Sequence, residues 1–530
     1  MLCNRSRALD GDRWLVALTV AIAIAIWFGD RVGFEGDDLA IIAGATHLDL
    51  TPRETVYRFS WQPLSYVLAH ILIQNGLAPL SLTYLANILG AIGIVLLAET
   101  LRRLMTARAR TWVAYGLVLA VPELWITTLY FNTTALGLPF FAGTLAMLSP
   151  QSSGQEPARW HSVVAGAMFA VACLLRFDFA AAAPALLAVV YFRSPHPKPR
   201  AVLVFAGGAA VTGCLILLAL RVNPLQLMAI AGGLRTHPWT AWRSAVVFGL
   251  AALPLIAISP FLAFELRRRN WRPLPLTRWV PIAILLLPLI YPLTSLYSGK
   301  YLVPAFCMAL FALAWLLGQP VRGEECSGVT LSSNLRWVTL ACSGAILVAV
   351  YLFGVQVDRK TWGVSGIGWT ASTFGTHDGV RPLAGYLGWL AIPRDPKQRN
   401  SGLLFHQNLA EWILRAPDDS IIVLLDNVEY EEREKHAVLV EEWSWGFPAL
   451  YLYGQGWRLD SYVMKQRIAM HARDGRRAEI VAEKNAPDAV PSHPCFIIVG
   501  AEREGNTGYE EVKRYADAVA TAPCNPIEAF

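Results

Sequence analysis

The sequence predicts an α-helical polytopic membrane protein of about 11 transmembrane helices, followed by a small C-terminal α/β domain outside the membrane. Apolar runs of roughly 16–22 residues recur from Trp14 to Gly354, and this is the length that crosses a hydrocarbon core. Only 16% of the residues are charged and the mean hydropathy is +0.41, which is too apolar for an ordinary soluble enzyme. After residue 354 the hydropathy falls, so a soluble domain is expected there.

The predicted membrane part, residues 1–354, consists of apolar spans joined by short loops and by one long loop at 30–80. The spans are expected at 14–29, 81–100, 111–130, 132–149, 161–176, 178–192, 201–220, 245–264, 279–296, 301–318 and 337–354. Four cysteines lie inside these runs, where cysteine acts as a small hydrophobic residue: Cys173, Cys214, Cys307 and Cys342. No cysteine pair has the Cys-x-x-Cys spacing of a zinc site.

Arginine and lysine set the expected orientation, because cytoplasmic loops carry an excess of these residues. The N-terminal end is rich in arginine, and loops predicted on the same side carry the basic segments 102–110, 193–200 and 267–278. The N-terminus is therefore expected in the cytoplasm, and an odd number of spans places the C-terminal domain outside an inner or plasma membrane. The first run is interpreted as an uncleaved anchor rather than a signal peptide. The net charge of +6 sits mainly in these loops, so no nucleic-acid partner is expected.

The loop at 30–80 is expected on the outer side and contains a helix. Apolar residues at i, i+3, i+4, i+7 and i+8 spacing predict an amphipathic helix lying at the membrane surface: Leu64, Val67, Leu68, Ile71 and Leu72. Aromatic residues in the same segment suit the membrane interface: Tyr57, Phe59, Trp61 and Tyr66.

The C-terminal third is expected to begin with a connector at 355–400, followed by a soluble extracytoplasmic α/β domain at 401–530. The segments "SIIVLLDN" and "CFIIVG" predict buried strands, and "QNLAEWILRA" and "YEEVKRYADAV" predict helices. Cys495 and Cys524 both fall in this domain, where an oxidising compartment permits a disulfide between them. Whether the two thiols are close enough to pair stays open at this point.

Three acids, Glu35, Asp37 and Asp38, stand in "FEGDD" just beyond the first apolar run. One interpretation is a solvated polar loop that caps the next helix. The other is a general base or metal ligand facing an outward cavity. Carboxylates suit Mg²⁺ or Mn²⁺, so a divalent metal can be accommodated, but the outer loops add no His or Cys cluster and no obligatory cofactor is expected.

Further polar residues are predicted on the same face. Arg176 and Asp178 stand between two apolar runs, as a site or as an ion pair that holds the helical hairpin. Lys300 and Tyr301 begin the tenth span, where a lone lysine also snorkels to the interface. Arg235, His237 and Arg243 belong to the loop before the eighth span, where a single histidine is usually a surface residue.

Acids, cations and aromatics on one membrane face are what a transferase with a lipid-phosphate donor requires. A carboxylate would deprotonate the acceptor hydroxyl as that hydroxyl attacks the anomeric carbon of the sugar. Cations would stabilise the phosphate that leaves with the lipid. Aromatic rings would stack on the sugar, and apolar grooves between the spans would hold the polyprenyl tail.

The order of these segments resembles the GT-C glycosyltransferases, especially the protein O-mannosyltransferase and lipid A aminoarabinose transferase branch. That branch has an Asp-Glu pair in its first outer loop, followed by a "PPLxY"-like segment. Here the pair reads Asp37-Asp38 and the segment reads "WQPLSY", with Gln62 where relatives often have a basic residue or proline. "LLRFD" at 174–178 is similar to the arginine-containing turn midway along these proteins, and "SGKYLVP" at 298–304 resembles their late "RYLLP" element.

The resemblance implies a GT-C-like fold and an inverting transfer from a polyprenyl-phosphate-linked sugar to a glycan, lipid or protein acceptor. It implies that Asp37 is the catalytic carboxylate and Asp38 its acidic partner. It implies donor-phosphate binding by Lys300, with Arg176 as the weaker candidate and Tyr301 beside them. Further substrate and loop candidates are Glu35, Trp61, Tyr66, Asp178, Arg235 and His237.

Two other classes of protein compete with this interpretation. A secondary transporter would place ionisable residues and Gly/Pro breaks near the bilayer midplane in two related halves, and no such halves are evident in the sequence. A non-catalytic membrane assembly protein could keep the outer domain but would lose little when Asp37 is changed.

Overall fold

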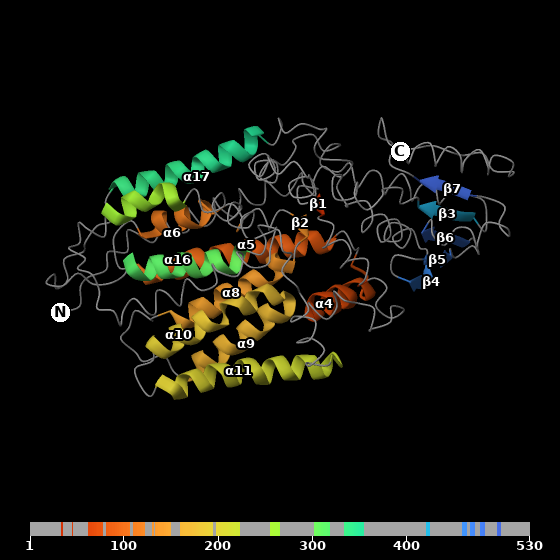
Figure 1. The fold of residues 1–530 in the computed structure, drawn as a ribbon, viewed down its shortest axis with the longest axis horizontal. Helices are drawn as coiled ribbons and strands as arrows, with labels where there is room; N and C mark the ends of the chain where they lie inside the picture. The colour runs from red at the N-terminus through yellow and green to blue at the C-terminus, as the bar shows by residue number, and fades with distance from the viewer. Residues whose placement is uncertain are drawn as a thin grey trace, which may run out of the picture. The chain divides into compact units, whose positions relative to one another are not determined.

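The computed structural model describes two compact units of the chain (Figure 1). The first comprises Met1–Val32, Ser60–Ser65 and Thr83–Gln356, and the second comprises Gly33–Phe59, Tyr66–Leu82 and Val357–Phe530. The residues described are 33–34, 45, 62–77, 81–105, 110–121, 124, 130–131, 133–149, 159–193, 198–222, 255–264, 302–317, 333–353, 420–424, 458–463, 467–471, 477–482 and 496–499.

Within the described residues, helices cover most of the length of seven predicted spans. They are α5 (Ser81–Leu104), α8 (Thr133–Leu148), α9 (Arg159–Leu175), α10 (Ala183–Arg193) with the 3₁₀ helix η2 (Phe177–Ala182) before it, α11 (Lys198–Ala219), α16 (Val303–Leu317) and α17 (Ser333–Phe353). The described part of the predicted span 245–264 is the apolar helix Leu255–Phe264. Within the described residues, two helical segments are long and apolar enough to cross a membrane, Leu85–Leu104 and Pro199–Ala219. The spans predicted at 14–29 and 279–296 lie outside the described residues.

The predicted span 111–130 is only partly described, and it is not one continuous helix. Helix α6 (Arg110–Leu119) covers about the first half of that length, Leu124 is again helical, and Tyr130–Phe131 form the two-residue strand β2. Pro122 follows the end of the helix closely and disfavours helical geometry in the residue before it. The apolar run continues through this proline, which is why hydropathy alone extended the span.

The helix predicted in the outer loop is present as α4 (Pro63–Gln74), but its buried face is not the predicted apolar stripe. Ser65, Tyr66, Ala69 and Ile73 are buried, whereas Ile71 of the stripe is 51% exposed. Small and hydroxyl side chains let α4 pack on the other face, so periodicity found the helix and misplaced its contact surface. Its position at a membrane surface stays a prediction.

Helix α9 packs against α8 and α11, and the three lie side by side (Figure 1). Gly166 of α9 lies against the backbone of α11 at Phe205, and a Cβ atom built on Gly208 of α11 would be only 2.5 Å from the Val163 carbonyl oxygen. The ring of Phe169 lies between those of its neighbours, with centroids 6.4 Å from Phe141 and 6.0 Å from Phe205. Small residues at the closest approach and rings beside it are typical of helix packing in membranes.

Two hydroxyl contacts show how α17 packs on α6. Ser343 Oγ lies 2.7 Å from the Gly116 carbonyl oxygen of α6 and 2.7 Å from the Thr339 carbonyl oxygen of its own helix. A Cβ atom on Gly116 would come within 3.1 Å of Thr339 Cβ. The two helices therefore approach closely because one of them has glycine at the contact.

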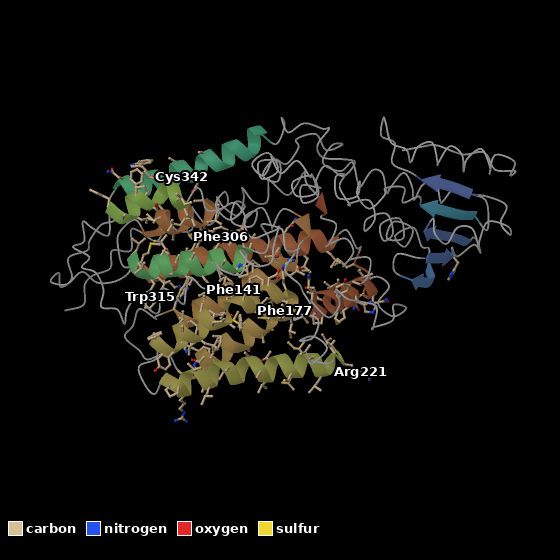
Figure 2. All side chains as sticks on the ribbon, viewed as in Figure 1. Phe141, Phe177, Arg221, Phe306, Trp315 and Cys342 are labelled. Carbon is tan, nitrogen blue, oxygen red and sulfur yellow. The ribbon has the colours of Figure 1, made fainter. Side chains whose placement is uncertain are left out.

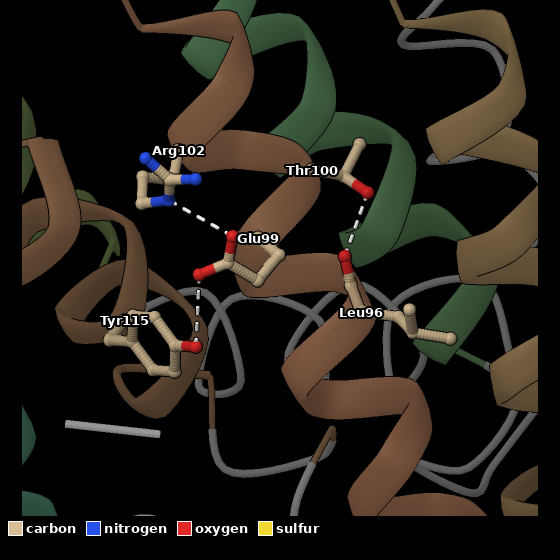
Figure 3. A network of polar contacts seen from close by, with 5 residues as sticks. All are labelled: Leu96, Glu99, Thr100, Arg102 and Tyr115. Carbon is tan, nitrogen blue, oxygen red and sulfur yellow. Dashed lines mark hydrogen bonds and ion pairs between the residues drawn. The ribbon is translucent and has the colours of Figure 1, made fainter. Parts of the chain in front are cut away.

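A buried polar network joins α5 to α6 (Figure 3). Arg102 Nε donates to Glu99 Oε2 at 3.0 Å, and Tyr115 Oη donates to Glu99 Oε1 at 3.3 Å. The arginine follows the glutamate by one helical turn, so the pair forms within α5 and the tyrosine connects it to α6. Ionisable groups are tolerated among apolar helices when they are paired in this way.

The second unit contains a five-stranded mixed sheet in the order β4-β5-β6-β3-β7. The central strand β3 (Ser420–Leu424) pairs in parallel with β6 (Arg477–Ala482) and β7 (Phe496–Val499). β5 (Arg467–His471) pairs antiparallel with β6 and with β4 (Arg458–Val463), whose ladder has an irregularity between Leu459 and Ser461. The same unit also contains the two-residue strand β1 (Gly33–Phe34), which is not part of this sheet.

The two strands predicted in this region, from "SIIVLLDN" and "CFIIVG", are confirmed as β3 and β7. β4, β5 and β6 were not predicted, because each mixes charged and apolar residues and so lacks the continuous apolar run of a parallel strand. The helices predicted from "QNLAEWILRA" and "YEEVKRYADAV", and the Cys495–Cys524 pairing, lie outside the described residues.

Candidate functional site

Arg176 stands at the junction between α9 and η2. Its backbone N–H still donates to the Ala172 carbonyl oxygen at 2.9 Å, so it completes the last turn of α9. Its φ of −156° and ψ of 117° are extended, which ends α9 and redirects the chain into η2. The sequence therefore places a cation where two helices meet.

The Arg176 side chain is bound on two sides. Its Nε donates to Asp178 Oδ2 at 2.5 Å, and its Nη1 donates to Thr133 Oγ1 at 2.9 Å. The side chains of Arg176 and Asp178 are only 4% and 5% exposed, so this is a buried ion pair. Charge-assisted hydrogen bonds of this kind fix geometry, and here they join η2 to the first residue of α8.

Aromatic packing holds η2 in place. The Phe179 ring is fully buried and its centroid lies 4.9 Å from that of Phe141 in α8. A Cβ atom on Gly137 would be 2.6 Å from Phe179 Cε2, so the ring occupies the space that this glycine leaves. Phe177, the first residue of η2, and Phe141 are both labelled in Figure 2. The backbone that presents Asp178 is thus fixed by α8.

The "WQPLSY" segment reaches the same junction. Ser65 Oγ, in the first turn of α4, donates to the Leu175 carbonyl oxygen at 2.7 Å, and this contact is buried. Leu175 directly precedes Arg176. Two segments that are 110 residues apart in sequence, and that carry two parts of the family resemblance, are therefore in direct contact.

The "SGKYLVP" segment leads into a helix that packs on η2. α16 starts at Val303 and contacts η2 and α8. Leu302 and Val303, which belong to the segment, are buried. The helix that follows Lys300 and Tyr301 therefore belongs to the same helical cluster as Arg176 and Asp178.

Of the predicted site residues, the structure describes Arg176, Asp178 and Tyr66. It brings the first two together as the ion pair that was one of the two interpretations of "LLRFD". Tyr66 is only 2% exposed, so its side chain packs inside the protein. The other predicted site residues lie outside the described residues: Glu35, Asp37, Asp38, Trp61, Arg235, His237, Lys300 and Tyr301.

Sequence reasoning missed the polar groups that complete the junction. Thr133 and Ser65 contribute hydroxyls, and such residues are too common in apolar helices to be noticed alone. Their positions in the sequence could have identified them, because each stands in the first turn of a helix that begins at the predicted outer side. Across the described ranges, no group of three or more His, Cys, Asp or Glu residues could hold a metal ion. The four cysteines described, at positions 173, 214, 307 and 342, are free thiols.

Comparison with known proteins identifies the fold. No protein-family model matches the chain, and no curated protein matches it. The chain matches a crystal structure of ArnT from Cupriavidus metallidurans bound to undecaprenyl phosphate, with a TM-score of 0.51, 15% sequence identity and coverage of 82% of this chain and 87% of that one. It matches the apo state of the same protein with a TM-score of 0.52, 15% identity and coverage of 82% and 88%.

At this level of identity the likeness establishes the fold and not the activity. ArnT is a GT-C protein of the aminoarabinose transferase branch that the residue motifs indicated. The chain therefore has the polytopic helical membrane fold of ArnT, as the sequence resemblance implied.

Proposed function

We propose that the protein is an integral-membrane glycosyltransferase that moves a sugar from a polyprenyl-phosphate donor to an acceptor hydroxyl on the outer membrane face, with inversion at the anomeric carbon. The fold supports this proposal, and so does the undecaprenyl phosphate that the ArnT structure contains. The acceptor would be a glycan, a lipid or a protein.

One observation carries the proposal beyond the fold. The Ser65–Leu175 hydrogen bond joins "WQPLSY" to "LLRFD", and α16, which follows "SGKYLVP", packs on η2. Two short segments selected from the sequence alone are thus in direct contact, and the helix that follows the third packs on the helix that follows the second. Segments without a shared role would not be expected to pack against one another in this way.

The proposed reaction uses the residues that the resemblance implied. The Asp37 carboxylate takes the proton of the acceptor hydroxyl while that oxygen forms a bond to the anomeric carbon. The bond between this carbon and the donor phosphate oxygen breaks, and its electron pair leaves with the polyprenyl phosphate. Lys300 stabilises the negative charge that develops on the phosphate, with Tyr301 beside it, and Asp38 positions Asp37.

Lys300 is a stronger candidate for the phosphate than Arg176. The Asp178 carboxylate already balances the positive charge of Arg176, so little attraction is left for a second anion. In this proposal Arg176 mainly positions the α9–η2 turn. The Asp37 and Asp38 carboxylates act without an obligatory metal ion.

The test is sugar transfer from synthetic polyprenyl-phosphate pentoses and hexoses by the full-length protein in membranes. Asp37→Asn keeps the size of the side chain but removes the base, so we expect a loss of roughly 10²-fold or more in kcat. Asp49→Asn, a carboxylate change in the same loop, is the matched control and should keep the wild-type rate. Protein amounts and donor binding are measured for each variant.

Two outcomes would contradict the proposal in different ways. Full transfer by Asp37→Asn would exclude the base mechanism while keeping the transferase. Absence of transfer by the wild-type protein from every pentose and hexose donor would exclude this class of donor.

A further inference from the structure

Gln62 carries an amide oxygen that has no hydrogen-bond partner. The residue stands immediately before α4 and is partly exposed, but its Oε1 atom is enclosed and makes no hydrogen bond in the described structure. A buried acceptor left unpaired lowers the folding equilibrium constant by roughly 10-fold or more. Native proteins satisfy nearly all such atoms, so an exception calls for an explanation.

The position of this oxygen suggests why it lacks a hydrogen-bond partner. The Gln62 backbone carbonyl accepts the Ser65 N–H at 3.0 Å, so Gln62 opens the first turn of α4. Ser65 in turn donates to the carbonyl of Leu175, beside Arg176. The unpaired oxygen therefore belongs to the segment that meets the Arg176–Asp178 junction, at the candidate functional site.

Hydrogen-bond chemistry limits which groups can be the partner of the Gln62 amide oxygen. A carbonyl oxygen needs a donor, and an unprotonated phosphate oxygen provides none. The Arg176 and Asp178 charges, in the segment that Ser65 contacts, balance one another, so this pair favours neither a cationic nor an anionic partner. Rotating the side-chain amide by 180° would place its NH₂ group where the oxygen now lies. A hydroxyl is the neutral group that can pair with either orientation, because it both donates and accepts hydrogen bonds.

We propose that Gln62 hydrogen-bonds a neutral hydroxyl of the sugar carried by the donor and thereby helps to determine which sugar is accepted. The identification of the hydroxyl with a donor sugar rests on the proposed function. The observation that the Gln62 oxygen is unpaired is independent of the proposed function. A site built to bond a substrate hydroxyl discriminates strongly against the analogue that lacks it, because the protein group is then left unpaired.

The experiment compares the full-length wild type with Gln62→Leu and with Gln74→Leu, an exposed glutamine at the other end of the same helix. The first arm measures the melting temperature in detergent without any substrate. The second measures kcat/KM for a polyprenyl-phosphate sugar and for its single-position deoxy analogues.

In the first arm, Gln62→Leu should melt no lower than Gln74→Leu, because it removes an unpaired buried oxygen. A melting temperature clearly below that of the control means that the glutamine has a structural partner, and this overturns the inference. This arm needs no transfer activity, so it decides on Gln62 even if the proposed function fails.

In the second arm, the wild type should prefer the complete sugar over one deoxy analogue by roughly 10²-fold or more, and Gln62→Leu should reduce that ratio to about threefold or less. The ratios for the other hydroxyls should not change. An unchanged ratio at every hydroxyl in Gln62→Leu overturns the assignment to the donor sugar. Lack of transfer by the wild type is instead a failure of the proposed function.

Discussion

At the residue scale, the Arg176–Asp178 pair is the best-defined chemical feature of the described protein. Both side chains are more than nine-tenths buried, so neither charge can be satisfied by bulk water. Removing one partner of such a pair leaves an uncompensated buried charge, whereas replacing both with apolar residues is often tolerated. The α9–η2 junction is therefore stable when both charges are present or both are removed, and is destabilised when only one is removed.

Asp178→Asn should destabilise the protein by about 3–5 kcal/mol, because it leaves the Arg176 guanidinium buried without its counter-ion. The double replacement Arg176→Met with Asp178→Leu should recover most of that loss. Arg200→Met, a change to an exposed arginine, is the control and should be close to neutral. Denaturant unfolding in detergent measures all three, and equal losses in the single and double variants would contradict this account.

Some of the site could be predicted at this scale, and some could not. Arg176 and Asp178 were recognisable because charged residues between apolar runs are expensive and so have a reason to be present. Thr133, Ser65 and Gln62 were not recognisable as parts of one junction. Their significance comes from neighbours that are distant in sequence, such as Leu175 for Ser65.

At the element scale, hydrophobic periodicity found the helices but not all of their ends and faces. It did not predict that α6 ends at Leu119 inside a longer apolar run, and it misplaced the buried face of α4, which contains Ser65 and Ala69. It also failed in the sheet, where the antiparallel strands mix polar and apolar residues. In each case packing against another element, or local backbone geometry, overrides the apolar pattern.

The contact between α9 and α11 depends on a glycine. A Cβ atom on Gly166 would overlap the Phe205 carbonyl oxygen, so Gly166→Ala should force the helices apart and destabilise the protein by about 1–3 kcal/mol. Gly207→Ala is the matched control, because a Cβ atom there meets nothing within 4 Å and should change stability by less than about 0.5 kcal/mol. Thermal unfolding compares the two, and equal stabilities would show that this close approach is not required.

At the scale of the whole molecule, the membrane fold explains surfaces that a soluble protein would hide. On α11, Leu203 and Leu218 are 70% and 73% exposed, and their neighbours on the same face are also apolar. Such a face suits contact with lipid. The arginine-rich N-terminal end and loops predict which side of the membrane each end occupies.

A reporter fused to the C-terminus tests that orientation. We expect an alkaline phosphatase fusion after Phe530 to be active and a fusion in the basic segment 102–110 to be inactive, because the enzyme folds only outside the cytoplasm. The reverse pattern would place the C-terminal domain in the cytoplasm and would contradict an outward-facing site.

The central claim, a site for a polyprenyl phosphate, is tested most directly by lipid binding to the purified protein. We expect undecaprenyl phosphate to raise the melting temperature more than undecaprenol does, with a stabilisation of about 2.7 kcal/mol at 100 times Kd. Lys300→Ala should lose this phosphate-dependent shift, while Asp37→Asn and the control Lys198→Ala should keep it. Equal shifts from the phosphate and the alcohol in the wild-type protein would contradict the claim.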